Sequence, residues 1–98
     1  MKENYKFIST FWMDFSIAEH YGPKAVIDTY NRAFNEWKTN YKMLTELVLV
    51  LNWKIWFWWE NGAMEEAKLY NDLWDKTAQY AESHLKGKEY DYYFEITD

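Results

Sequence analysis

The 98 residues of this chain suffice for one small domain, residues 1–98, which typically buries roughly 60–65% of the surface that the unfolded chain exposes. The absence of Cys excludes disulfide bonds, thiolate metal sites and cysteine nucleophiles. The formal net charge of −5, with a single Arg and ten Lys spread along the chain, argues against a basic surface for nucleic-acid phosphates.

Gly and Pro divide most of the chain into four segments that we expect to be helices. These cover about residues 11–21, 23–38, 40–61 and 63–86. Pro23 is a favoured first-turn residue, and Gly22, Gly62 and Gly87 stand where helices should end. Since short connections favour antiparallel neighbours, the pattern predicts an all-α domain resembling a four-helix bundle.

The two ends of the chain show a different pattern. Around residues 90–96, Tyr90, Tyr92, Phe94 and Ile96 occupy alternate positions, and such a period of two predicts a short β-strand. Tyr5 and Phe7 are candidates for a partner strand near the N-terminus. A two-stranded pair is stable only when it packs on other elements, so we expect these strands to lie against the helices.

The most apolar segment is residues 47–59 (LVLVLNWKIWFWW), where eleven of thirteen positions are apolar and four are Trp. Successive helical residues are turned by about 100°, so a helix through this segment has two apolar sides. The expected core side comprises Leu44, Leu47, Val48, Leu51, Ile55 and Trp58. The opposite side carries Leu49, Trp53 and Trp56, with Phe57 on its flank.

A helix that is apolar on all sides must be enclosed, and two interpretations stay open. In the first, the other helices and the ends of the chain wrap it completely. In the second, Leu49, Trp53, Trp56 and Phe57 form a surface that binds a partner protein or a second copy, as Trp-rich interface centres do. A membrane role is not expected, because the apolar run from Met43 is too short to span a bilayer and contains four polar residues.

Catalytic and metal-binding patterns are missing from the sequence. His20 and His84 lie near predicted helix ends, where a cation favours the helix dipole, and neither has an acidic residue three or four positions before it. We therefore predict no enzyme activity, no metal and no cofactor. On the fourth predicted helix, Glu65, Asp72, Asp75 and Glu82 share one face. They form either a solvated surface with ion pairs such as Lys68–Asp72 and Asp72–Lys76 along the helix, or an acidic surface for a basic partner.

Three stretches that together span most of the chain carry a resemblance. They are STFWMDFSIAEHYGPKAVIDTYNRAFNEWKTNYK, LTELVLVLNWKIW and the segment from LYNDLWDKTAQYA to LKG. They resemble a group of small helical proteins encoded by integrative and conjugative elements and prophages of gut Firmicutes. This group has no assigned activity, so the resemblance implies a mobile-element context but no site residues.

Three functions follow as hypotheses. The first is a non-enzymatic protein-interaction module that uses the aromatic helix face. The second is an acidic inhibitor of a host nucleic-acid-processing or defence enzyme, similar in action to anti-restriction or anti-CRISPR proteins. The third is a small-molecule binder with an aromatic pocket between helices. Since the N-terminus (MKENYKFIST) has no apolar segment typical of a signal peptide, we expect a cytoplasmic protein.

Overall fold

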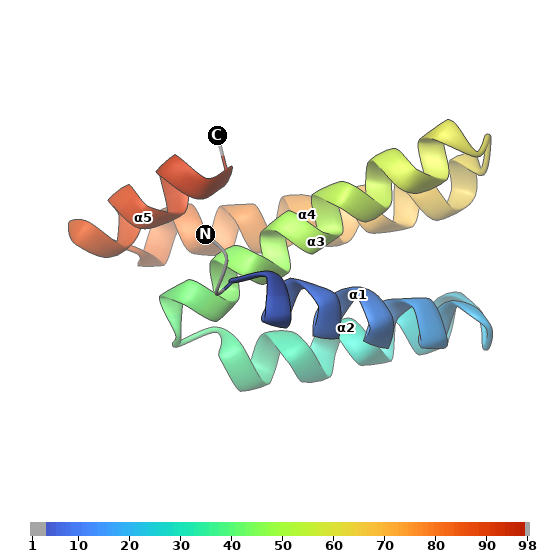
Figure 1. Ribbon diagram of the computed structural model, residues 1–98, viewed down its shortest axis with the longest axis horizontal. Coiled ribbons are helices and arrows are strands. Elements are labelled where there is room, and N and C mark those ends of the chain that lie inside the picture. The colour runs from blue at the N-terminus through green and yellow to red at the C-terminus, as the bar shows by residue number, and fades with distance from the viewer. Residues whose placement is uncertain (1–3, 98) are drawn as a thin grey trace.

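The computed structural model of the protein describes residues 4–97, with side chains from residue 10 onward, and this part of the chain forms five helices (Figure 1). They are α1 (Asn4–Glu19), α2 (Pro23–Trp37), α3 (Tyr41–Glu60), α4 (Met64–His84) and α5 (Lys88–Thr97). No strand occurs within residues 4–97, so the predicted all-α class is confirmed.

The helices form two antiparallel pairs with a fifth helix at one end. Helices α1 and α2 lie side by side, and the α3–α4 pair packs on them (Figure 1). Helix α5 lies at the end of the α3–α4 pair that is far from the turn between these two helices (Figure 1). Gly22 and Gly62 follow α1 and α3 with φ of 109° and 76°, which few other residues adopt, so the predicted breaks at these glycines are confirmed.

Helix α3 is the centre of the fold, because it contacts each of the other four helices. Asn40 caps its start, with Oδ1 accepting a hydrogen bond of 3.1 Å from the backbone N–H of Met43. The larger core cluster joins α3 to the first, second and fourth helices through Phe11, Phe15, Ala18, Val26, Tyr30, Met43, Leu47, Val50, Leu51, Tyr70 and Leu73. Every side chain from residue 43 to residue 48 is buried, so α3 is enclosed on all sides over this stretch.

The predicted C-terminal strand is wrong, because residues 88–97 form α5. The same ten residues carry a helical stripe in addition to their alternation, since Tyr90, Tyr93, Phe94 and Thr97 follow three- and four-residue steps. Tyr93 joins a second core cluster with α3 and α4, which also comprises Leu44, Val48, Ala81 and Leu85. Burial against two existing helices thus favours the helical arrangement of this tail.

The predicted N-terminal strand is also wrong. Helix α1 begins at Asn4, so Tyr5 and Phe7 lie within it and the helix starts seven residues earlier than the expected residue 11. The reason is that residues 4–10 contain no Gly or Pro, so nothing interrupts the helix that the following residues form.

Candidate functional site

The second half of α3 carries four large aromatic side chains that reach solvent. Trp53 is 40% exposed, Trp56 57%, Phe57 41% and Trp59 55%. We call these four residues the aromatic surface. The exposed parts add up to about two whole aromatic side chains, or roughly 300–500 Å². The largest apolar patch of a typical monomer is roughly 300–600 Å² and is often functional, so this surface has the size of a binding patch.

The aromatic surface lies on the part of α3 that α5 does not reach (Figure 1). Helix α5 contacts α3 at the other end, far from the turn that follows Glu60 (Figure 1). On one flank, Phe57 packs edge to face on Trp12 of α1, with ring centroids 5.6 Å apart. Trp53 and Trp56 both stay partly open to solvent.

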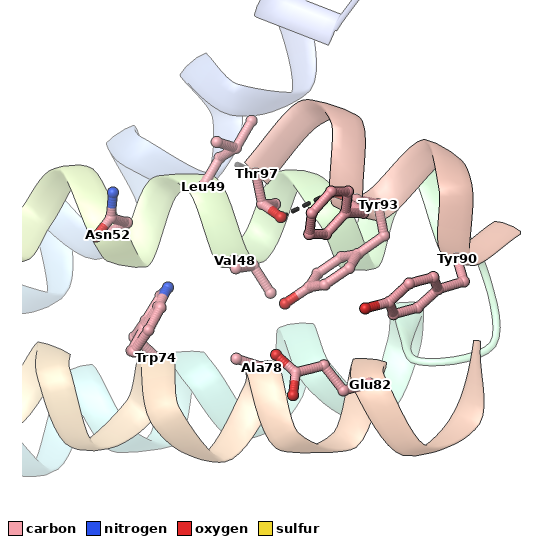
Figure 2. Close-up of a pocket in the computed structure, with 10 residues that line it drawn as sticks. Val48, Leu49, Asn52, Trp74, Ala78, Glu82, Tyr90, Tyr93 and Thr97 are labelled. Carbon is pink, nitrogen blue, oxygen red and sulfur yellow. Dashed lines mark hydrogen bonds between the residues drawn. The ribbon is translucent and has the colours of Figure 1, made fainter. Parts of the chain in front are cut away.

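The predicted set of four residues is only partly brought together. Trp53, Trp56 and Phe57 lie on the exposed part of α3, whereas Leu49 is half-buried and faces a cavity that α5 closes (Figure 2). The sequence reasoning missed Trp59. Trp59 lies about 80° from the core-facing Leu51 on a helical wheel, which suggests partial cover, but the last turn of α3 leaves it exposed.

A buried ion pair lies behind the aromatic surface. Lys54 of α3 is almost completely buried, and its Nζ lies 3.0 Å from Oε2 of Glu19 at the end of α1. The ammonium group also donates to Ser16 Oγ at 2.8 Å and lies 3.9 Å from the ring centroid of Trp12. Burial lowers the pKa of Lys54, and the Glu19 carboxylate opposes this shift.

The carboxylate oxygen of Glu19 that contacts Lys54 also accepts hydrogen bonds from two other residues. Oε2 of Glu19 accepts hydrogen bonds from Trp58 Nε1 at 3.0 Å and from the Tyr70 hydroxyl at 2.6 Å. Burial raises the pKa of Tyr70, and its bond to the Glu19 carboxylate raises it further. Helices α1, α3 and α4 are therefore joined at one atom, which holds the C-terminal half of α3 in a fixed position.

The four carboxylates of the predicted acidic face of α4 are exposed, and two of them are bonded to neighbours on the same helix. Asp72 pairs with Lys68 at 3.4 Å, as predicted, and Asp75 accepts a hydrogen bond from Gln79 at 3.0 Å. Glu82 lines the cavity under α5, while Glu65 lies in the first turn at the opposite end of α4. This arrangement favours the interpretation of a solvated face.

Within residues 4–97 the structure holds no group of three or more His, Asp or Glu side chains placed to bind a metal ion. His84 lies in the last turn of α4, where its ring stacks on Tyr80 with centroids 3.9 Å apart. Among the helices of residues 4–97, none has both the length and the hydropathy needed to cross a bilayer.

Comparison of the chain with protein family models, with curated proteins and with solved structures finds no match. Any function must therefore be inferred from the side chains themselves.

Proposed function

We propose that this chain is a cytoplasmic, non-enzymatic interaction module that binds a partner protein through the aromatic surface. The observation that carries the proposal is the exposure of Trp53, Trp56, Phe57 and Trp59 on consecutive turns of one helix. Trp is enriched at the centres of protein interfaces, because it buries a large area and loses few rotamers on binding.

The polarity of α3 is inverted at this surface, and the inversion supports the proposal. Lys54, the one basic residue between Met43 and Glu60, is buried, whereas Trp56 two positions later is more than half exposed. A helix selected for stability alone would bury the indole and expose the ammonium group. Departures of this kind are expected where a surface is used for binding.

The rigid support behind the surface favours the same interpretation. The hydrogen bonds of Glu19 to Lys54, Trp58 and Tyr70 hold this part of α3 against α1 and α4. A surface that is already fixed loses little conformational entropy when a partner binds. The aromatic side chains are therefore presented in a form that is ready for docking.

Charge selects the kind of partner. No basic residue occurs between residues 55 and 67, while Glu60, Glu65 and Glu66 follow the aromatic residues along the chain. Glu60 lies on the same side of α3 as Trp56, because the two are four residues apart. The partner that fits is an apolar segment flanked by Lys or Arg, whereas a second copy of this acidic chain would bring like charges together.

The hypothesis of an acidic inhibitor receives less support from the geometry. An acidic inhibitor would need the α4 carboxylates to act together, yet Asp72 and Asp75 are each bonded to a neighbour on the same helix. The proposed mobile-element origin rests on the sequence resemblance alone, and it agrees with a small module that acts by binding.

A random 15-residue peptide display library, selected on the immobilised full chain, tests the proposal. We expect the enriched peptides to combine apolar residues with Lys or Arg, and to lose binding to Trp53→Ser/Trp56→Ser. The matched control is Ile27→Ser, which removes an exposed apolar side chain from α2 and should retain binding. Enriched peptides that bind the double variant as well as the original chain would refute the proposal.

Two further measurements locate the binding site and test whether a second copy of the chain, in place of a partner protein, covers the aromatic surface. The seven Trp residues give seven indole N–H signals in a ¹H–¹⁵N spectrum, and a selected peptide should shift those of Trp53, Trp56 and Trp59 but not that of Trp74. Light scattering between 10 µM and 1 mM should report a monomer. If the chain is instead a dimer, and Trp56→Glu dissociates it, then the aromatic surface binds a second copy and not a different protein.

A further inference from the structure

Helices α3, α4 and α5 line a cavity of about 360 Å³ that opens to solvent and is separate from the aromatic surface (Figure 2). Helix α5 packs chiefly on α3 and touches α4 less, so a space remains between α5 and the facing side of α4. Its walls are Val48, Leu49 and Asn52 of α3, Trp74, Ala78 and Glu82 of α4, and Tyr90, Tyr93, Phe94 and Thr97 of α5.

Polar groups from α4 and α5 converge on this cavity. The hydroxyls of Tyr90 and Tyr93 and the carboxylate of Glu82 point into it, and Trp74 stands between α4 and α3 below Asn52 (Figure 2). The structure gives no hydrogen bond within residues 4–97 to the side chains of Asn52, Trp74, Glu82 or Tyr90. These groups can therefore serve a ligand without breaking a contact of the fold.

Tyr93 shows that the inner part of the cavity is shielded from water. Only 5% of this residue is exposed, and burial together with the nearby Glu82 carboxylate raises the pKa of its hydroxyl to about 12. The hydroxyl of Thr97 is bonded to the Tyr93 backbone carbonyl at 2.7 Å. Tyr93 thus presents a neutral hydroxyl to the cavity at physiological pH.

Glu82 sets the charge of the cavity. It is the one acidic residue among the ten lining residues, and no Lys, Arg or His lines the space. The side chain is exposed, so it stands at the mouth, while aromatic rings form much of the wall. A carboxylate beside aromatic rings attracts a cation and repels an anion.

We propose that this cavity binds a small organic monocation, namely a primary ammonium ion with a compact apolar body. The ammonium group has three donors and no acceptor, and the carboxylate of Glu82 and the hydroxyl oxygens of Tyr90 and Tyr93 offer it acceptors at one end of the cavity (Figure 2). The apolar body packs among Trp74 and Phe94. A volume of about 360 Å³ suits a ligand near the small end of the roughly 300–1,000 Å³ range of ligand sites.

Titration of the full chain with 2-phenylethylammonium tests this site. We expect a saturable shift of the Trp74 indole N–H signal at millimolar or lower ligand concentration, with one ligand bound per chain. Glu82→Gln should weaken binding at least five-fold while keeping the shape of the side chain. The matched control is Asp75→Asn, which neutralises another exposed carboxylate of α4 outside the cavity and should leave affinity unchanged.

A second pair of measurements separates charge from shape. The neutral isostere 2-phenylethanol should bind at least five-fold more weakly than the ammonium ion, and Ala78→Met, which fills the cavity from α4, should weaken both. Each variant is first compared with the original chain by far-ultraviolet circular dichroism to establish that it is folded. Equal binding of the alcohol and the ammonium ion, an unchanged affinity in Glu82→Gln, or no saturable shift at 20 mM ligand would overturn the proposal. The double variant Trp53→Ser/Trp56→Ser leaves this cavity intact and should bind the ammonium ion normally. The outcome at the cavity is therefore independent of the outcome at the aromatic surface.

Discussion

Glu46 gives a quantitative test of the packing around α3. This residue is 1% exposed, and its Oε2 accepts no hydrogen bond from any described residue. Burial raises the pKa of the Glu46 carboxyl from its ordinary value of 4.5 to about 7. The folded chain thus binds a proton more tightly than the unfolded chain does, so Glu46 contributes most to stability below pH 4.5, and this contribution is lost as the pH rises through about 7.

The size of the effect follows from the two pKa values. A tenfold difference in proton affinity is worth about 1.4 kcal/mol, so a pKa of about 7 in place of 4.5 costs roughly 3 kcal/mol at pH 8. At pH 5 the same linkage costs under about 1 kcal/mol, because most folded molecules carry the proton. Replacing Glu46 by Gln removes this pH dependence. The buried amide adds a cost of its own, but that cost is the same at both pH values.

Urea unfolding followed by circular dichroism at pH 5 and pH 8 measures the effect. We expect the free energy of unfolding of Glu46→Gln, relative to that of the original chain, to increase by about 2–3 kcal/mol between pH 5 and pH 8, so that the variant becomes relatively more stable. The control is Glu60→Gln, which neutralises an exposed carboxylate of the same helix and should shift by less than about 0.5 kcal/mol. A Glu46→Gln difference that stays constant between the two pH values would show that this carboxyl is hydrated, and would refute the burial of this side of α3.

Three further predictions concern the ion pair, a buried hydrogen bond and the aromatic surface. Lys54→Ala should lower the free energy of unfolding by about 3–5 kcal/mol, because it leaves a partly buried carboxylate without its cation. By contrast, Lys24→Ala breaks an exposed pair and should cost at most about 1 kcal/mol in the same urea titration. Tyr30→Phe should cost about 1 kcal/mol in thermal unfolding, since it removes the 2.7 Å hydrogen bond between the Tyr30 hydroxyl and Thr77 that joins α2 to α4. Trp56→Ser should change the free energy of unfolding by less than about 0.5 kcal/mol, and a loss of several kcal/mol would mean that this indole is part of the core.

The sequence was sufficient for the helices that Gly and Pro delimit and for the core side of α3. Leu44, Leu47, Val48 and Leu51 are all buried, because a helical wheel depends only on local geometry. The same wheel placed Trp53 and Trp56 on the opposite side of α3, and the structure leaves both exposed. The sequence pattern could not predict which part of α3 the neighbouring helices cover, because this depends on where α5 packs.

The features that the sequence did not predict depend on contacts between distant residues or on an ambiguous pattern. In residues 88–97 the alternation of Tyr90, Tyr92 and Phe94 coexists with a helical stripe, and burial of Tyr93 between α3 and α4 favours the helix. The cavity under α5 was unpredictable for the same reason. The partner of Lys54 is Glu19 on another helix, and no local spacing connects the two.

The high hydropathy of residues 47–59 therefore has two physical causes rather than one. As far as Leu51, the apolar side chains fill a core in which α3 touches every other helix, and truncating them would unfold the chain. Beyond Leu51 the side chains divide: Ile55 and Trp58 still pack against the core, whereas Trp53, Trp56 and Trp59 keep 40–57% of their surface in water. Large exposed indoles lower solubility and add little to the stability of the fold, which is why we propose a partner that covers them.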